Sequence, residues 1–196
     1  RLAATAVLLL GLGLGLWFVL RPGAPPAAAV GVAAVSITVE RNDERLLLPA
    51  GRELFVGDRI RTTKMAGIKL HDGSEVKLAA GSILRVAEPA ATQRYRLQLE
   101  HGRVFCRVAK RPKRFVVTGG ATVEVLGTVF GVKEEAGQTV ASVYAGKVRL
   151  SNGRGRLELV RGQSGVAPAL TGPHRLDMDP NDDLQWARDP VSFSSR

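Results

Sequence analysis

The pattern of apolar and polar residues divides the chain into one long uncharged run and many short alternating segments. Residues 2–20 carry no charged side chain, and Arg1 and Arg21 flank them. A helix of this length rises ~28 Å at ~1.5 Å per residue, close to the thickness of the hydrocarbon core of a bilayer. Trp17 lies near one end, where aromatic rings favour the headgroup region. The run therefore predicts one transmembrane helix at residues 1–21.

A cleaved signal peptide is the alternative interpretation of this run. Its charged start fits that class, and Ala-rich sequence follows at residues 25–29. The apolar stretch is longer than the usual hydrophobic region of a signal peptide, which favours a permanent anchor. Gly11 and Gly15 have the spacing of a helix-packing motif, although this spacing is common in apolar segments. Because the chain opens at Arg1 without a methionine, we expect an N-terminal portion to precede it.

Beyond the helix, the sequence predicts a linker, one β domain and a polar tail. Residues 22–31 consist almost entirely of Pro, Ala and Gly, as extended linkers do. Short apolar alternations follow, and turn signals recur every ~10 residues, as in sandwiches, barrels and solenoids of short strands. We therefore expect an all-β domain at residues 32–170. The tail at 171–196 is expected to pack loosely, with Asn181 capping one helical turn.

Two dipeptides predict tight hairpins within the β domain. Asp72-Gly73 and Asn152-Gly153 each lie between two alternating segments, and Gly accepts a positive φ at no steric cost. Gly102 is interpreted as a turn that separates two further strands. Strands are also expected at residues 97–100, 103–109, 114–118, 122–126, 129–133 and 139–144.

The net charge of +10 indicates an affinity for anionic material, but most basic residues are scattered singly. The tight basic run surrounds a proline and comprises Lys110, Arg111, Lys113 and Arg114. This run indicates either a solvated turn or a contact patch for an anionic surface or partner. A nucleic-acid site would require interleaved aromatic residues, and Phe105 between Arg103 and Arg107 is the nearest match. Because the predicted membrane anchor already indicates an address outside the cytoplasm, we expect no direct contact with nucleic acid.

The sequence offers no constellation typical of catalysis. Cys106 is the single cysteine, which excludes an internal disulfide, and its alternating neighbours predict a thiol packed in the core. His71 and His101 adjoin glycines and are expected in turns, while His174 lies in the tail. No metal-ligand spacing, phosphate-binding loop or dinucleotide motif occurs. We therefore expect no enzyme activity, cofactor, metal or small-molecule substrate.

Several short motifs follow one another in the order seen in a known family. They lie at residues 57–62, 68–78, 96–108, 114–118 with 125–132, 143–148 and 159–163. Together these motifs cover roughly residues 50–166, and this stretch resembles the FecR domain. The motif residues, all interpreted as turn or core positions, are Gly57, Asp58, Asp72, Gly73, Ser74, Gly127, Thr128, Phe130, Gly146 and Gly162.

The resemblance implies a compact β-solenoid-like stack in a single-pass protein of the bacterial inner membrane. It also implies that the N-terminus is cytoplasmic and that the β domain is periplasmic. Relatives of this kind relay an envelope signal to a cytoplasmic sigma factor, so the leading hypothesis is an anti-sigma-factor-like regulator. The contact with the sigma factor would then precede Arg1. The alternative is a non-regulatory periplasmic module that binds an anionic envelope polymer or scaffolds protein partners.

Overall fold

The structure is a computed structural model that describes residues 28–188. The transmembrane helix expected at residues 1–21 and most of the linker expected at 22–31 lie outside the described residues. Within the described part of the chain, no helix has the length and apolarity needed to cross a membrane.

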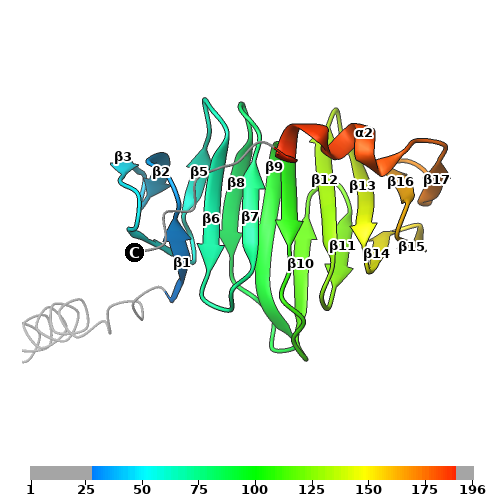
Figure 1. The fold of residues 1–196 in the computed structure, drawn as a ribbon, viewed down its shortest axis with the longest axis horizontal. Coiled ribbons are helices and arrows are strands. Elements are labelled where there is room, and N and C mark those ends of the chain that lie inside the picture. Colours follow the sequence, from blue (N-terminus) through cyan, green and yellow to red (C-terminus); the bar gives the residue numbers. More distant parts are fainter. Residues whose placement is uncertain (1–27, 189–196) are drawn as a thin grey trace, which may run out of the picture.

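The described residues form two stacked sheets that share one long strand, β9 (Figure 1). Sheet A contains the second half of that strand. In order across sheet A the strands are β4 (Glu53–Phe55), β1 (Ala29–Ala33), β6 (Ala66–Leu70), β7 (Glu75–Leu78), β9 (Gln93–Arg107), β12 (Val129–Glu135), β13 (Gln138–Ala145), β16 (Gln163–Pro168) and β17 (His174–Leu176).

Sheet B contains the first half of β9. In order across sheet B the strands are β3 (Glu44–Leu48), β2 (Ile37–Arg41), β5 (Arg59–Arg61), β8 (Ile83–Ala87), β9, β10 (Arg114–Thr118), β11 (Thr122–Val125), β14 (Lys147–Asn152) and β15 (Gly155–Val160).

The chain advances along the long axis of this stack, from β1–β3 at one end to β15–β17 at the other (Figure 1). The all-β prediction is confirmed. Among the described strand pairs, β9 and β10 run parallel and every other pair is antiparallel. The stack therefore resembles the expected solenoid in its advance along one axis, while nearly all of its neighbouring strands are antiparallel, some joined as hairpins and others brought together from separate parts of the chain.

One apolar core fills the space between the two sheets. The rings of Tyr95 and Phe115 meet edge to face with centroids 6.2 Å apart, and those of Phe115 and Phe130 meet in the same way at 6.4 Å. Such pairs contribute ~1 kcal/mol each beyond the area that they bury. Cys106 is a free thiol that is fully buried in this core, as its neighbours predicted. Burial also raises the pKa of the Cys106 thiol well above its ordinary value.

Both predicted hairpins are confirmed. Gly73, at φ 86°, turns the chain between β6 and β7, and the Asp72 carboxylate accepts a hydrogen bond from the Ser74 backbone N–H at 2.9 Å. Asn152 pairs with Gly155 at the end of the β14–β15 hairpin. These turns set the register that places alternate side chains inside and outside the stack.

The prediction of two strands divided by a turn at Gly102 is wrong. β9 continues through this position, so His101 is also a strand residue rather than a turn residue. Gly102 has φ 92° and lies against Ser82, whose Cα would be 2.7 Å from a Cβ at this position. The Ser82 hydroxyl accepts from the Arg103 N–H and donates to the Arg103 carbonyl, both at 3.0 Å. This glycine thus bends the strand from one sheet into the other without ending it.

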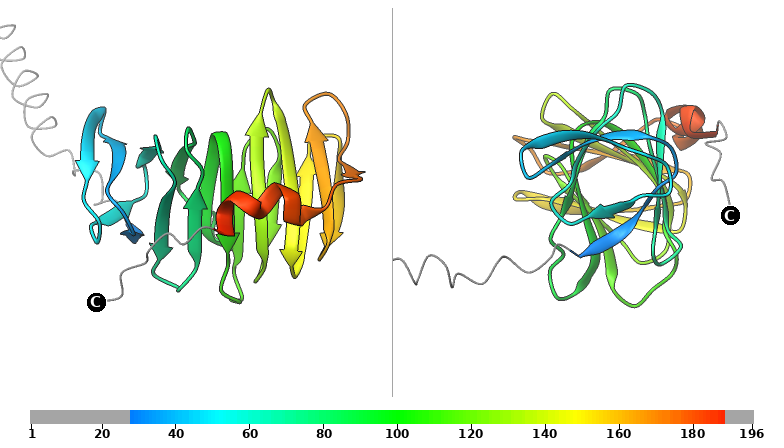
Figure 2. Two further views of the ribbon diagram at one scale, coloured as in Figure 1. Left: turned by 45° about the horizontal axis from the view of Figure 1, so that its top comes forward. Right: turned by 90° about the vertical axis from the view of Figure 1, so that its left-hand side faces the viewer.

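The boundaries expected for the linker and the tail also require correction. β1 begins at Ala29, inside the expected linker, because Gly31 pairs with Leu70 and lets the backbone of β6 approach closely. In the expected tail, β17 pairs with β16. The short helix α2 (Pro180–Leu184) and a following 3₁₀ turn, η1 (Gln185–Arg188), then cross the outside of sheet A (Figure 2).

This C-terminal strap, residues 180–188, is held by packing and hydrogen bonds. The side chain of Leu184 is buried and reaches Gly131, where any Cβ would clash with its terminal methyl group. Ser142 donates to the Asp183 carboxylate at 2.9 Å, and Lys77 Nζ donates to the Ala187 carbonyl at 2.8 Å. The tail therefore packs against the sheet instead of lying loose, because β12 carries a glycine where the strap crosses it.

The N-cap of α2 also differs from the expectation by two residues. Asp179 caps the helix and accepts from the Asn181 backbone N–H at 2.8 Å, while Pro180 occupies the first turn. A proline fits there because the first helical N–H groups have no partner within the helix.

Substitution of Gly131 should loosen the strap without disrupting the sheets. In Gly131→Val, the new side chain would occupy the space of Leu184, so amide hydrogen exchange across residues 180–188 should accelerate at least tenfold while exchange in β9 and β13 stays unchanged. Gly153→Val is the matched control because a Cβ at Gly153 meets no atom within 4 Å. Equal exchange in both variants would show that Leu184 does not hold the strap.

Candidate interaction surface

Outward-facing positions of sheet B carry a ladder of Arg and Glu side chains. At the N-terminal end, Glu40 on β2 accepts hydrogen bonds from Arg59 and Arg61 on β5 at 2.8 Å each, and from Arg45 on β3 at 3.1 Å. Arg59 also donates from Nε to both oxygens of Glu100 on β9, at 3.0 and 2.9 Å. Cross-strand alternation of opposite charges stabilises neighbouring strands.

These contacts shift the protonation equilibria of the ladder. Hydrogen bonds from Arg59, Arg61 and Arg45 lower the pKa of Glu40 to about 2. The pKa of Glu100 is lowered chiefly by Arg59, and the pKa of Arg59 is raised by Glu100 and Glu40. This half of the ladder therefore remains fully charged at neutral pH.

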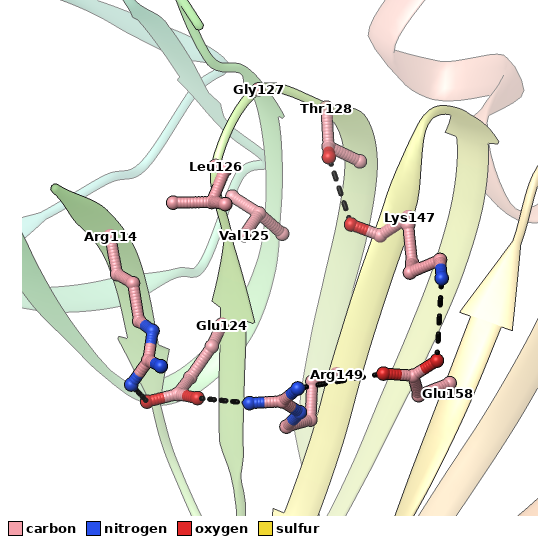
Figure 3. A pocket seen from close by; sticks show the side chains of 9 residues that line it. All are labelled: Arg114, Glu124, Val125, Leu126, Gly127, Thr128, Lys147, Arg149 and Glu158. Carbon is pink, nitrogen blue, oxygen red and sulfur yellow. Dashed lines mark hydrogen bonds and ion pairs between the residues drawn. The ribbon is translucent and has the colours of Figure 1, made fainter. Parts of the chain in front are cut away.

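The ladder continues at the C-terminal end with looser pairs (Figure 3). Glu124 on β11 lies 3.7 Å from both Arg114 on β10 and Arg149 on β14. Glu158 on β15 lies 3.5 Å from Arg149 and 3.4 Å from Lys147. The ion pairs in this half of the ladder are therefore longer than those around Glu40.

The loose half of the ladder lines a shallow hollow of about 230 Å³ that we call the basic groove (Figure 3). Its lining residues are Arg114, Glu124, Val125, Leu126, Gly127, Thr128, Lys147, Arg149 and Glu158. Val125 is buried, whereas the side chain of Leu126 is 51% exposed. Thr128 donates to the Lys147 carbonyl at 2.9 Å and so fixes the loop that carries Leu126 against β14.

The basic run, interpreted from the sequence as either a solvated turn or a contact patch, adjoins this groove. Arg114 lines it directly. Lys110 packs against Gly127, where a Cβ would lie 2.8 Å from the Lys110 Cα, and the Arg111 N–H donates to the Leu126 carbonyl at 3.1 Å. The Arg111 guanidinium turns away to the Asp72 carbonyl at 3.1 Å, and Lys113 is exposed.

Sequence reasoning missed the part of the groove on β14 and β15. A signal for it was present, because the Asn152-Gly153 hairpin fixes Arg149 opposite Glu158. The pairing of β11 with β14, which brings Glu124 to Arg149, joins segments whose contact the local pattern does not reveal.

Residues 58–149 match the family model described as "FecR protein". The matched stretch is a FecR domain. The matched residues lie within the stretch whose motifs resembled this family, so that prediction is confirmed. A search of curated proteins finds no match.

Solved structures share the fold. Two crystal structures of a putative anti-sigma factor from Parabacteroides distasonis ATCC 8503 align with the chain at a TM-score of 0.57 each, with 25% and 24% identity. Each alignment covers 66% of this chain. The chain spans 63% and 62% of the two aligned structures.

The motif residues of the FecR domain make the contacts of turns and core. Gly57 and Gly146, like Gly73, have positive φ, and Phe130 is buried in the aromatic cluster. The Ser74 hydroxyl accepts from the Ala109 N–H at 3.0 Å. Gly162, just beyond the matched residues, also has a positive φ of 79°.

Asp58 is the most buried charge among these motif residues. Its carboxylate accepts from Arg41 Nε and Nη2 at 2.7 Å each and from the Phe55 backbone N–H at 2.9 Å. The same Arg41 guanidinium lies 4.6 Å from the centre of the Phe55 ring. One carboxylate therefore joins the turn after β4 to the end of β2.

The described residues form no cluster of metal-ligating side chains. They contain no group of three or more His, Cys, Asp or Glu side chains that could hold a metal ion. His71, His101 and His174 are exposed and lie on different parts of the stack. The basic groove is the candidate recognition surface of the described residues.

Removal of the Asp58 carboxylate should destabilise the FecR domain strongly. Asp58→Ala leaves the Arg41 guanidinium and the Phe55 N–H without their partner, so the free energy of unfolding should fall by ~3 kcal/mol in urea denaturation. Glu88→Ala, at an exposed position, is the control and should change it by less than ~0.5 kcal/mol. A similar small loss in both variants would contradict this role.

Acid should weaken the tight half of the ladder. Because the folded pKa of Glu40 is about 2, below its ordinary value of 4.5, its stabilising contribution is present above pH 4.5 and is lost as the pH falls toward 2. Glu40→Gln should flatten the fall in unfolding free energy across this interval, measured by urea denaturation at each pH. A slope equal to that of the unaltered protein would exclude Glu40 as a source of the pH dependence.

Proposed function

We propose that the chain is a membrane-anchored regulator that relays an envelope signal to a cytoplasmic partner, a sigma factor. The match of residues 58–149 to the FecR family is the observation that carries this proposal. The shared fold with a protein described as a putative anti-sigma factor supports a regulatory role. The relay consists of protein–protein contact and includes no catalytic step.

The proposal places the protein in the bacterial inner membrane with its FecR domain in the periplasm. The uncharged run at residues 2–20 is long enough for one membrane-spanning helix. Such a helix would connect a signal received by the β stack to an output on the other side of the membrane.

A second candidate function is a periplasmic module that binds an anionic envelope polymer. The observation in its favour is the excess of basic side chains on the outer face of sheet B, where Arg94 and Arg96 join the cations of the ladder. This candidate differs from the first because polymer binding would depend steeply on salt and would need no cytoplasmic partner.

Co-purification from cells tests the regulatory proposal. The natural protein, tagged at its C-terminus, should retain a sigma factor through detergent extraction. Deletion of residues 2–20 should shift the protein out of the membrane fraction. A natural protein that retains no sigma factor, yet binds envelope polymer in a salt-dependent manner, would favour the second candidate.

The same tag reports on topology. If the FecR domain is periplasmic, protease added outside the inner membrane of spheroplasts should remove the tag. Protection of the tag until the inner membrane is lysed would contradict the proposed orientation.

A further inference from the structure

We propose that the basic groove binds an acidic segment of a partner protein that also carries an apolar side chain. This inference deepens the proposed function by naming the surface and the chemistry of a partner, and it rests on that function only in taking the ligand to be a protein. It concerns the FecR domain itself, so it can fail while co-purification of the sigma factor succeeds.

The charges around the groove favour an acidic ligand. Arg114, Lys147 and Arg149 line it, while Glu124 and Glu158 supply the only negative charges of the lining. Lys110 and Lys113 extend the positive surface along the adjoining loop. A hollow lined mainly by charges of one sign accelerates and orients the approach of an oppositely charged segment.

The cations of the groove are also available for exchange. Their distances to Glu124 and Glu158 are 3.4–3.7 Å, and the side chains of Lys147, Arg114 and Arg149 are 64%, 47% and 43% exposed. Exposed pairs of this kind contribute ~0–1 kcal/mol, so a ligand carboxylate can replace a Glu partner at small cost. At the other end of the same face, Arg59 is only 22% exposed and is held at 2.8 Å by Glu40.

Two exposed apolar side chains beside the groove favour an acidic peptide over other anionic ligands. Leu126 is on the loop fixed to the Lys147 carbonyl, and Val160, which pairs with Lys147 across the β14–β15 ladder, is 42% exposed. An acidic peptide with an apolar residue can bury these groups while its carboxylates meet the cations. The groove lining contains no aromatic ring on which a nucleic-acid base could stack.

Fluorescence anisotropy with defined probes tests this inference on the whole chain in a non-ionic detergent. The first probe is a labelled glutamate-rich peptide with a central pair of leucines, and the second has serines in place of the leucines. The unaltered protein should bind the leucine probe at least threefold more tightly than the serine probe. Leu126→Ser/Val160→Ser should remove that preference.

Charge reversal supplies the decisive comparison. Lys147→Glu/Arg149→Glu should weaken binding of the leucine probe at least tenfold. Arg45→Glu/Arg85→Glu is the matched control: it makes the same change in net charge on the same face, at side chains that are 66% and 46% exposed. The control should weaken binding threefold at most, and melting temperatures of all variants should confirm that they fold.

Three outcomes would overturn the inference. One is an equal loss of binding in both charge-reversed variants, which would indicate general attraction to a basic surface. Another is equal binding of the leucine and serine probes with full competition by inorganic polyphosphate, which would identify a polyanion surface. The third is no binding of the leucine probe at millimolar concentration.

Discussion

The bend in β9 at Gly102 is the constraint on which both sheets depend. Before this residue, Leu97 and Leu99 point into the core, and after it Val104 and Cys106 do. The inward side chains thus change from odd to even positions across a bulge between Leu99 and His101 and the positive φ of Gly102. Because the two halves of β9 pair with β8 and β10 in sheet B and with β7 and β12 in sheet A, this one strand aligns both sheets around a single core.

The same geometry explains why recognition residues gather on sheet B. After the bend, the chain returns from sheet A to sheet B through the loop that carries the basic run, and β10 then lies parallel to the first half of β9. That loop meets the Leu126–Thr128 loop at the same margin of the stack. Cations from distant segments, such as Arg114 and Arg149, therefore share one surface although their sequence neighbours are ordinary strand residues.

Local patterns predicted much of the fold because most strands end in short turns with a chemical signature. The Asp72-Gly73 and Asn152-Gly153 turns and the burial of Cys106 needed only neighbouring residues to be inferred. The turn predicted at Gly102 was wrong, because a point inside a strand where the inward-facing positions change from odd to even has the same sequence signature as a turn. The groove and the strap could not be derived locally, because they require the β11–β14 pairing and the fit of Leu184 over Gly131.

The two outer faces of the stack differ in how they are occupied. On sheet A, the strap covers Gly131 and engages Ser142 and Lys77. On sheet B, Arg–Glu pairs are the principal cover, and they are tighter around Glu40 than around Glu124 and Glu158. A partner that competes for the Arg and Lys side chains gains the most binding free energy where the existing ion pairs are longest and most exposed. Within the described residues, the most adaptable recognition surface is therefore the C-terminal half of sheet B, on the face opposite the strap.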